Sequence, residues 1–97
     1  MIKLEKKESI YFLNLAANEN RWNTTFVREI AKALDEIEKD EGPGALITSS
    51  ENPKFFSNGL DLDWMQDPKS NPDGGDRDVF GKEFMHLMGR FITLPIP

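Results

Sequence analysis

Apolar and charged residues alternate over residues 2–6, which is the pattern of a half-buried β-strand. Residues 9–16 follow with apolar side chains on both faces, which predicts a second strand. We expect the two strands to form an antiparallel hairpin with its turn at Lys7 and Glu8. Neither a glycine nor an Asn-Gly pair marks this turn, so the prediction depends on the strand patterns alone.

A helical spacing of apolar residues comes next and is ended by Gly42-Pro43-Gly44. Asn23 or Thr24 can cap the start of this helix. The apolar stripe consists of Phe26, Ile30, Ala33, Leu34 and Ile37. Residues 45–49 (Ala-Leu-Ile-Thr-Ser) then form a short apolar run, typical of a buried strand. The order strand, helix, strand predicts a right-handed crossover between parallel strands.

The rest of the chain alternates loops with helical patterns. We expect a loop at residues 51–56, a short helix at 60–65 and a mobile surface loop at 66–78, which is rich in Asp, Pro, Asn, Ser and Gly. Residues 79–93 predict a helix, which Pro95 ends because it disfavours the helical conformation at Leu94. The apolar face of this helix contains Val79, Phe80, Phe84, Leu87, Met88, Phe91 and Ile92. Together these patterns predict one small α/β domain over residues 1–97.

Composition excludes several classes of function. The chain has 97 residues, with 12 Lys and Arg against 17 Asp and Glu, so its net charge is −5. We expect no nucleic-acid partner, because phosphate contacts require clustered cations. The absence of cysteine excludes disulfides and thiolate metal sites. No apolar run is long enough to span a bilayer, and residues 1–9 lack the apolar stretch of a secretory signal.

Few polar residues form a catalytic pattern. His86 is the only histidine, so we expect no metal site and interpret it as a surface or packing residue. No nucleophile elbow, Walker loop or dinucleotide-binding glycine motif is present. The acidic run 35–41 is interpreted as a solvated helix end, in which Asp35 and Lys39 can pair at i, i+4.

The informative stretch is residues 52–65 (Asn-Pro-Lys-Phe-Phe-Ser-Asn-Gly-Leu-Asp-Leu-Asp-Trp-Met), which links a predicted strand to the short helix. Gly59 lets the backbone turn sharply and approach a ligand. Amides at the start of the helix point outward and can stabilise an oxyanion on a thioester carbonyl. On physical grounds alone, a loop and helix cap without a ligand is the commoner alternative. Glu51, Asp61 and Asp63 are interpreted as solvated or capping carboxylates.

Residues 54–62 (Lys-Phe-Phe-Ser-Asn-Gly-Leu-Asp-Leu) resemble the first oxyanion-hole motif of the enoyl-CoA hydratase/isomerase (crotonase) family. The version found here is most similar to that of peroxisomal-type enoyl-CoA delta isomerases. The hairpin, the loop with Arg21 and Asn23, the helix, the strand and the closing Leu-Pro-Ile-Pro also follow the family's order. The resemblance therefore covers essentially the whole chain and implies the N-terminal portion of a crotonase-like ββαβ spiral fold.

The resemblance implies a binding site for an acyl-CoA or enoyl-CoA substrate, with no separate cofactor. In the family, the residue after the glycine donates its backbone N–H to the thioester oxygen, and the matching position is Leu60. Arg21 could offer its charge to CoA phosphates, or it could be a solvated loop arginine. The implied substrate-binding residues are Arg21, Trp22, Asn58, Gly59, Leu60, Asp61 and Leu62.

The implied activity is isomerisation or hydration of fatty enoyl-CoA in β-oxidation, in the peroxisome or the cytoplasm. Family members are longer, and their second oxyanion motif and catalytic carboxylates lie beyond the position of Pro97. Activity of this chain is therefore left open. The alternatives are a non-catalytic fragment or pseudo-enzyme that acts through protein–protein interaction, with homo-oligomers expected, and an unrelated α/β domain.

Overall fold

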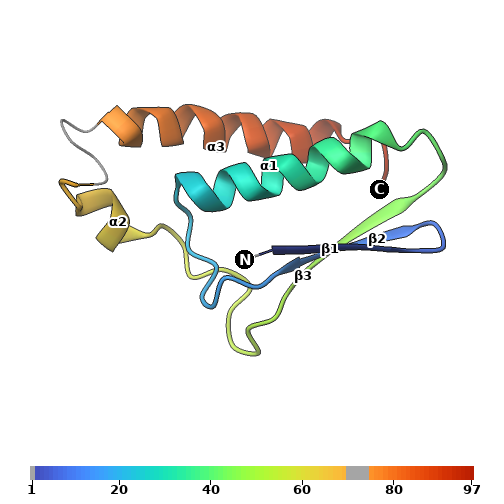
Figure 1. The fold of residues 1–97 in the computed structure, drawn as a ribbon, viewed down its shortest axis with the longest axis horizontal. Helices are drawn as coiled ribbons and strands as arrows, with labels where there is room; N and C mark the ends of the chain where they lie inside the picture. The colour runs from blue at the N-terminus through green and yellow to red at the C-terminus, as the bar shows by residue number, and fades with distance from the viewer. Residues whose placement is uncertain (1, 70–74) are drawn as a thin grey trace.

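A computed structural model describes residues 2–69 and 75–97. One three-stranded sheet lies beneath two long helices, and a short helix lies beside them at one end (Figure 1). The elements in chain order are β1 (Ile2–Lys7), β2 (Ile10–Leu15), α1 (Thr24–Lys39), β3 (Ala45–Ser50), α2 (Leu62–Gln66) and α3 (Gly75–Thr93). The arrangement agrees with the α/β fold class that the sequence predicts.

The sheet has the order β1-β2-β3. β1 and β2 are antiparallel, with Leu4 opposite Leu13, whereas β2 and β3 are parallel, with Phe12 opposite Ile47. The predicted hairpin and the predicted crossover between parallel strands are therefore confirmed. Glu8 in the hairpin turn has a φ of 57°. This left-handed conformation costs about 1–2 kcal/mol for a residue with a Cβ, so the strands stabilise a turn that the sequence does not mark.

The hydrophobic core lies between the sheet and α1, with α3 packed beside α1 (Figure 1). Leu13 and Leu15 of β2 are buried, while Phe12 and Asn14 alternate with them and point to the other face of the sheet. The fully buried large apolar side chains of α1 and α3 are Phe26, Val27, Ile30, Leu34 and Leu87. The predicted stripe of α1 is confirmed. On α3, Val79 and Ile92 are 40% and 84% exposed, so their predicted place on the packed face is wrong.

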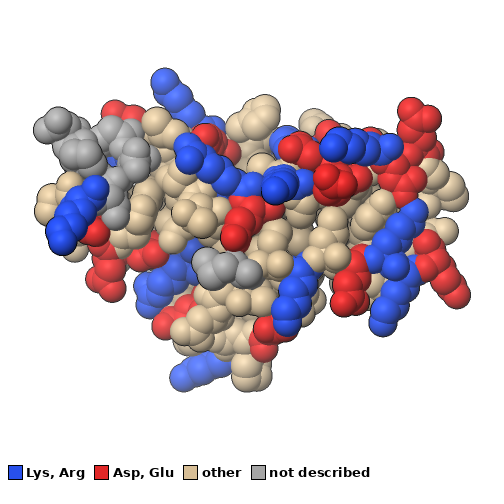
Figure 2. Space-filling view, in the orientation of Figure 1, with Lys and Arg blue, Asp and Glu red and all other residues tan. Residues whose placement is uncertain are grey.

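Ion pairs connect the two long helices. Arg90 of α3 donates to the Ala31 carbonyl at 3.1 Å and pairs with Asp35 at 2.9 Å. Lys39 pairs with Glu36 instead of Asp35, so the predicted i, i+4 pair is wrong. Acidic and basic side chains lie next to one another over the helices in Figure 2, as these pairs require. The acidic side chains at the end of α1 are therefore paired both across helices, with Arg90, and within α1, with Lys39.

Several element boundaries differ from the sequence predictions. The hairpin turn lies at Glu8 and Ser9 instead of Lys7 and Glu8, because Lys7 still pairs with Ile10 in the sheet. α2 begins at Leu62 instead of residue 60, because Asp61 is its N-cap. α3 begins at Gly75 instead of residue 79, and α2 ends at Gln66, so the predicted loop 66–78 is shorter at both ends. Residues 70–74 of that loop lie outside the described residues, and its mobility stays a prediction. Among the described helices, none combines the length and the apolar character needed to cross a membrane.

Candidate functional site

The candidate site lies where two loops meet at one edge of the sheet. Because β2 and β3 are parallel, their carboxyl ends reach the same edge. The first loop (residues 16–23) follows β2, and the second loop (residues 51–61) follows β3. Both loops lie below the start of α1, next to α2 (Figure 1). All seven site residues predicted from the sequence lie in these loops or at the first position of α2.

Asn20 joins the two loops from a fully buried position. Its side-chain oxygen accepts a hydrogen bond from the Ala17 N–H at 2.9 Å. Its amide donates to the Ser50 hydroxyl at 2.8 Å and to the Phe56 carbonyl at 2.9 Å. The Ser57 hydroxyl donates back to the Asn20 carbonyl at 2.7 Å. Sequence reasoning missed this residue, although it fixes the position of the second loop.

A signal for the role of Asn20 is present in the sequence. Asn18 and Asn20 have φ angles of 57° and 53°, and asparagine is enriched among residues that adopt the left-handed region. Two asparagines in a short loop after a strand therefore indicate a tight turn. The sequence does not reveal the partners of the Asn20 amide, Ser50 and Phe56, which lie 30 and 36 positions away.

Gly59 and Leu60 are held against the first loop by backbone hydrogen bonds. The Trp22 N–H donates to the Gly59 carbonyl at 2.8 Å, and the Asp61 N–H donates to the Trp22 carbonyl at 2.9 Å. Gly59 has a φ of 80°, and a Cβ there would meet nothing within 4 Å. Conformation rather than space therefore requires glycine at this position.

The Leu60 amide points away from these bonds. Trp22 uses the carbonyl before Leu60 and the amide after it, in the pattern of a parallel bridge. Because the Gly59 carbonyl and the Leu60 N–H belong to one trans peptide group, they point in opposite directions, and the Leu60 N–H is directed away from Trp22. Within the part of the chain that the structure describes, this N–H has no acceptor, and Leu60 is 44% exposed. It is an available donor at the surface of the site.

Two helix N-caps meet beside Leu60. The Asn23 side-chain oxygen accepts from the Phe26 N–H at 2.9 Å at the start of α1. The Asp61 carboxylate accepts from the Trp64 N–H at 3.1 Å at the start of α2. The Asn23 amide also donates to the second Asp61 oxygen at 2.9 Å. The capping interpretation of Asp61 is confirmed, and the link between the caps is a feature that the sequence did not predict.

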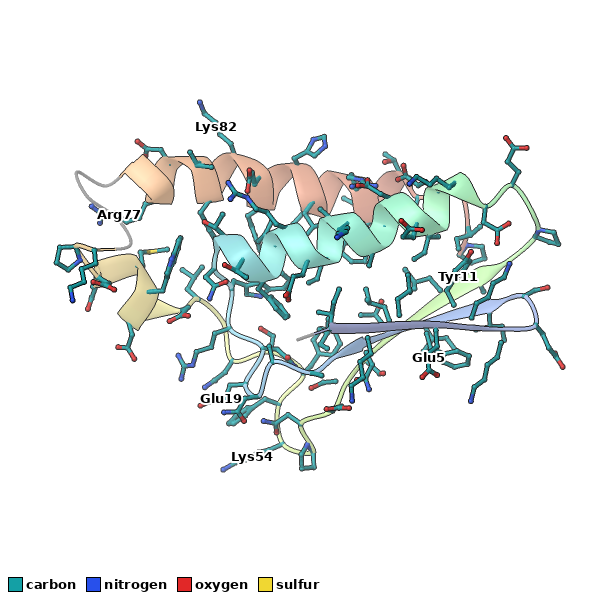
Figure 3. The ribbon with its side chains drawn as sticks, in the orientation of Figure 1. Glu5, Tyr11, Glu19, Lys54, Arg77 and Lys82 are labelled. Carbon is teal, nitrogen blue, oxygen red and sulfur yellow. The ribbon has the colours of Figure 1, made fainter. Side chains whose placement is uncertain are left out.

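Arg21 lies in a polar cavity of about 220 Å³ next to these caps. Its guanidinium pairs with Glu19 at 3.1 Å, and Glu19 also accepts from the Asn58 amide. Glu19 projects from the first loop, near the tip of the second loop where Lys54 lies (Figure 3). The cavity is lined by Ala17, Asn18, Glu19, Arg21, Asn23, Phe26 and Asp61. Arg21 is therefore held in place by Glu19 beside Asp61.

Trp22 points in another direction from Arg21. Its ring packs edge-on against Phe26 at 5.0 Å and Phe84 at 5.2 Å between centroids. It lines an apolar cavity of about 310 Å³ together with Leu15, Ile30, Thr48, Phe56, Met88 and Phe91. The structure therefore places the side chains of Arg21 and Trp22 in different cavities, although the Trp22 backbone touches Gly59 and Asp61.

The remaining polar and aromatic residues have structural roles. Glu51 pairs with Lys3 at 2.6 Å, and Trp64 packs against Phe80 at 5.7 Å between ring centroids.

The apolar side chains of Leu60 and Leu62 are exposed at the site. Leu62 is 53% exposed and Leu60 is 44% exposed, so both side chains are open to a ligand. His86 is exposed on a groove between α1 and α3, as its surface interpretation predicts. No group of acidic and histidine side chains in residues 2–69 and 75–97 could hold a metal ion.

Known proteins of similar sequence are enoyl-CoA delta isomerases. The peroxisomal enoyl-CoA delta isomerase 1 of Arabidopsis thaliana is 33% identical over 100 residues, covering 100% of this chain and 39% of that protein. The peroxisomal enoyl-CoA delta isomerase 2 of the same plant is 28% identical over 99 residues, covering 100% of this chain and 41% of that protein. The chain thus spans about two fifths of the length of these relatives. No protein-family model matches the sequence.

Solved structures of similar fold agree with these relatives. An enoyl-CoA hydratase from Shewanella pealeana superposes with a TM-score of 0.84 at 21% identity, over 99% of this chain and 36% of that one. The chain resembles the crotonase family over its whole length. A crotonase-family hydratase/isomerase from Legionella pneumophila gives a TM-score of 0.82 at 21% identity, over 99% of this chain and 37% of that one. The crotonase-like fold expected from residues 54–62 is confirmed.

Proposed function

We propose that the two loops bind the thioester end of an acyl-CoA or enoyl-CoA, with the Leu60 N–H donating to the thioester oxygen. The observation that carries this proposal is the outward direction of the Leu60 amide, which has no acceptor among the described residues. Gly59 on one side and Asp61 on the other fix that direction through Trp22. The similarity to enoyl-CoA delta isomerases supports a thioester as the ligand.

Such a donor fits double-bond isomerisation. Removal of a proton next to a thioester places negative charge on its oxygen, and an amide already aimed at that oxygen stabilises the enolate. Loss of one such donor typically costs about 2.7–4 kcal/mol in the transition state. Isomerisation is favoured over hydration because the curated relatives are named isomerases, and two of them support a peroxisomal location by name.

The chain supplies only part of the proposed chemistry. None of its carboxylates matches the catalytic carboxylates of the family, and Glu51 and Asp61 are occupied by an ion pair and a helix cap. The first oxyanion donor and part of the CoA contact are therefore the contributions we assign to residues 1–97. The second donor and the group that moves the proton belong, in this proposal, to a further segment of a longer family member.

Arg21 is proposed to contact the CoA phosphates. Its side chain lines the polar cavity and is 38% exposed, so its guanidinium can exchange the Glu19 carboxylate for a phosphate group. The apolar cavity behind Trp22 and the exposed side chains of Leu60 and Leu62 provide separate apolar surface for an acyl chain.

Calorimetric titration of the chain with octanoyl-CoA, combined with infrared spectroscopy of a ¹³C-labelled thioester carbonyl, tests this function. We expect saturable binding and a carbonyl band shifted to lower frequency. Leu60→Pro, which removes the amide, should abolish the shift. Leu60→Ala, which keeps the amide, should retain it and weaken binding only through lost apolar contact.

A control proline shows whether Leu60→Pro acts through the site. Glu41→Pro is suitable, because Glu41 is exposed in another loop and Asp40 before it already has the extended backbone that proline requires (ψ 113°). We expect Glu41→Pro to bind octanoyl-CoA as the wild type does. A folded wild-type chain without saturable binding, or a carbonyl shift that survives Leu60→Pro, overturns the proposed function.

Exposed apolar side chains on α3 favour a second candidate, an interaction role. Met85 and Ile92 are 71% and 84% exposed, and Ile47 of β3 is 47% exposed. Exposed apolar surface of this kind promotes association, including the homo-oligomers expected from the family. Sedimentation over a wide concentration range should show oligomers that Ile92→Glu weakens. A monomer at all concentrations counts against this candidate.

A further inference from the structure

The side chains of Asn23 and Asp61 each make two kinds of hydrogen bond, one to a helix N-terminus and one to the other residue. In each residue one oxygen caps a helix, at Phe26 for α1 and at Trp64 for α2. The groups left over, the Asn23 amide and the second Asp61 oxygen, then bond to each other at 2.9 Å. Capping requires only one oxygen per residue, so the link between the residues is an additional feature.

The two helices that this link joins differ in how firmly they are held. α1 has 16 residues and buries seven of them, including Phe26 and Ile30, in the core. α2 has five residues and buries none. A bond between the caps therefore ties a lightly packed element to a firmly packed one. Asn23 is the fixed partner, because its backbone belongs to the start of α1.

Leu60 lies between Gly59 and Asp61, which are both held by the first loop. Its neighbour Asp61 is held twice by the first loop, through its N–H to the Trp22 carbonyl at 2.9 Å and through its carboxylate to Asn23. The two backbone bonds, at Gly59 and at Asp61, both end on Trp22, so together they form one line about which the segment can still tilt. The side-chain bond ends on Asn23, one residue further along the first loop, so it lies off this line and opposes a tilt of the peptide groups around Leu60.

We propose that Asn23 is a positioning residue, which acts through the Asp61 carboxylate to keep the Leu60 N–H aimed at the thioester oxygen. This inference rests on the proposed function. Asn23 itself does not contact the reacting atoms in the proposal, although it lines the polar cavity beside Arg21. Its amide acts on the direction of the donor and not on the chemistry.

Single substitutions separate the link from the caps. Asn23→Ser keeps a preferred N-cap for α1 but is too short to reach Asp61. Asp61→Asn keeps an oxygen for the Trp64 N–H but places an amide against the Asn23 amide. Asn23→Asp keeps the cap of α1 but places two carboxylates face to face, which is repulsive. We expect each variant to lose at least half of the carbonyl frequency shift of bound ¹³C-octanoyl-CoA.

The double variant Asn23→Asp with Asp61→Asn provides the decisive rescue. Asp and Asn are both strong N-caps, so both helix caps remain. The amide of the new asparagine can donate to the new aspartate, which restores the link in the opposite direction. We expect the double variant to recover most of the carbonyl shift, whereas a role in capping alone would leave the shift unchanged in every variant.

The outcomes distinguish this inference from the function on which it rests. If the wild-type chain is folded and does not bind octanoyl-CoA, both the proposed function and the positioning role are overturned. If the wild type binds and shows the carbonyl shift, and Asn23→Ser shows the same shift, only the positioning role is overturned. A shift that is lost in all single variants and is not recovered in the double variant also overturns it, because the direction of Leu60 would then not depend on the bond between the caps.

Discussion

Asn20 is the residue on which the geometry of both loops depends. Its buried side chain uses one oxygen and one amide to connect Ala17, Ser50 and Phe56. A glycine can be recognised in a sequence by its type, and Gly59 was predicted in this way. Asn20 was not, because an asparagine in a loop has the same appearance whether it is solvated or fully buried. At the scale of the residue, the sequence predicted the glycine turn but not the buried asparagine that supports it.

Asn20→Ala should lower the free energy of unfolding by about 2–4 kcal/mol, since buried groups lose their partners and alanine disfavours the φ of 53°. Asn18→Ala is the matched control, because Asn18 has a φ of 57° and an exposed side chain. It should cost only roughly 1 kcal/mol. Urea unfolding of the three proteins measures the difference, and equal costs would show that the buried hydrogen bonds contribute little.

Strands and helices were predictable from spacing, whereas their ends were set by side chains elsewhere in the fold. The start of α2 moved from residue 60 to Leu62 because Trp22 pairs with Leu60 and Asp61 takes the capping position. The end of α1 shows the same effect. Asp40 caps it and accepts bonds from Lys6 of β1 and from the Tyr11 hydroxyl at 2.7 Å, which lies between β2 and α1 (Figure 3).

Asp40 should make the stability of the chain sensitive to acid. The Lys6 ammonium, the Tyr11 hydroxyl and the Gly42 N–H donate to its carboxylate and hold its pKa well below the ordinary value of 3.8. A lowered folded-state pKa stabilises the fold above about pH 4 and loses this contribution as the pH falls further. Asp40→Asn should therefore show a flatter fall in unfolding free energy between about pH 5 and pH 2.

Urea unfolding across that pH range measures the effect of Asp40. Glu41→Gln is the control, because Glu41 is the exposed neighbour in the same loop. Its curve should follow the wild type. Parallel curves for wild type and Asp40→Asn would show that solvent screens the cluster, which is partly open to water.

At the scale of the whole molecule, the apolar pattern predicted which helices pack but not how they meet. Leu87 was predicted on the packed face of α3 and is 1% exposed, whereas Ile92 was predicted there and is 84% exposed. The pairing of Arg90 with Asp35 was beyond prediction too, because its partners lie 55 positions apart on different helices. Periodicity identifies a face, and only the packed fold decides how wide that face is.

Leu87→Ala should test the packing of α3 on α1. Removal of this buried side chain is expected to cost about 2–5 kcal/mol, because a cavity replaces its contacts. Met85→Ala on the same helix, where the side chain is 71% exposed, should change stability by less than about 0.5 kcal/mol. Thermal or urea unfolding measures both. A small cost at Leu87 would mean that α3 is loosely docked in solution.

The hydrogen bonds between the two loops also bear on the order in which the protein assembles. Ser57 and Asn20 are 37 positions apart, so their bond forms only after a long stretch of chain has been ordered. Closing a loop of this length costs conformational entropy before the contact is made. Such contacts therefore form late, after the local helices and the hairpin. The direction of the Leu60 amide is therefore among the last features that the folding chain acquires. A ribosome must therefore release the chain as far as Asp61 before the bonds that orient this amide can form.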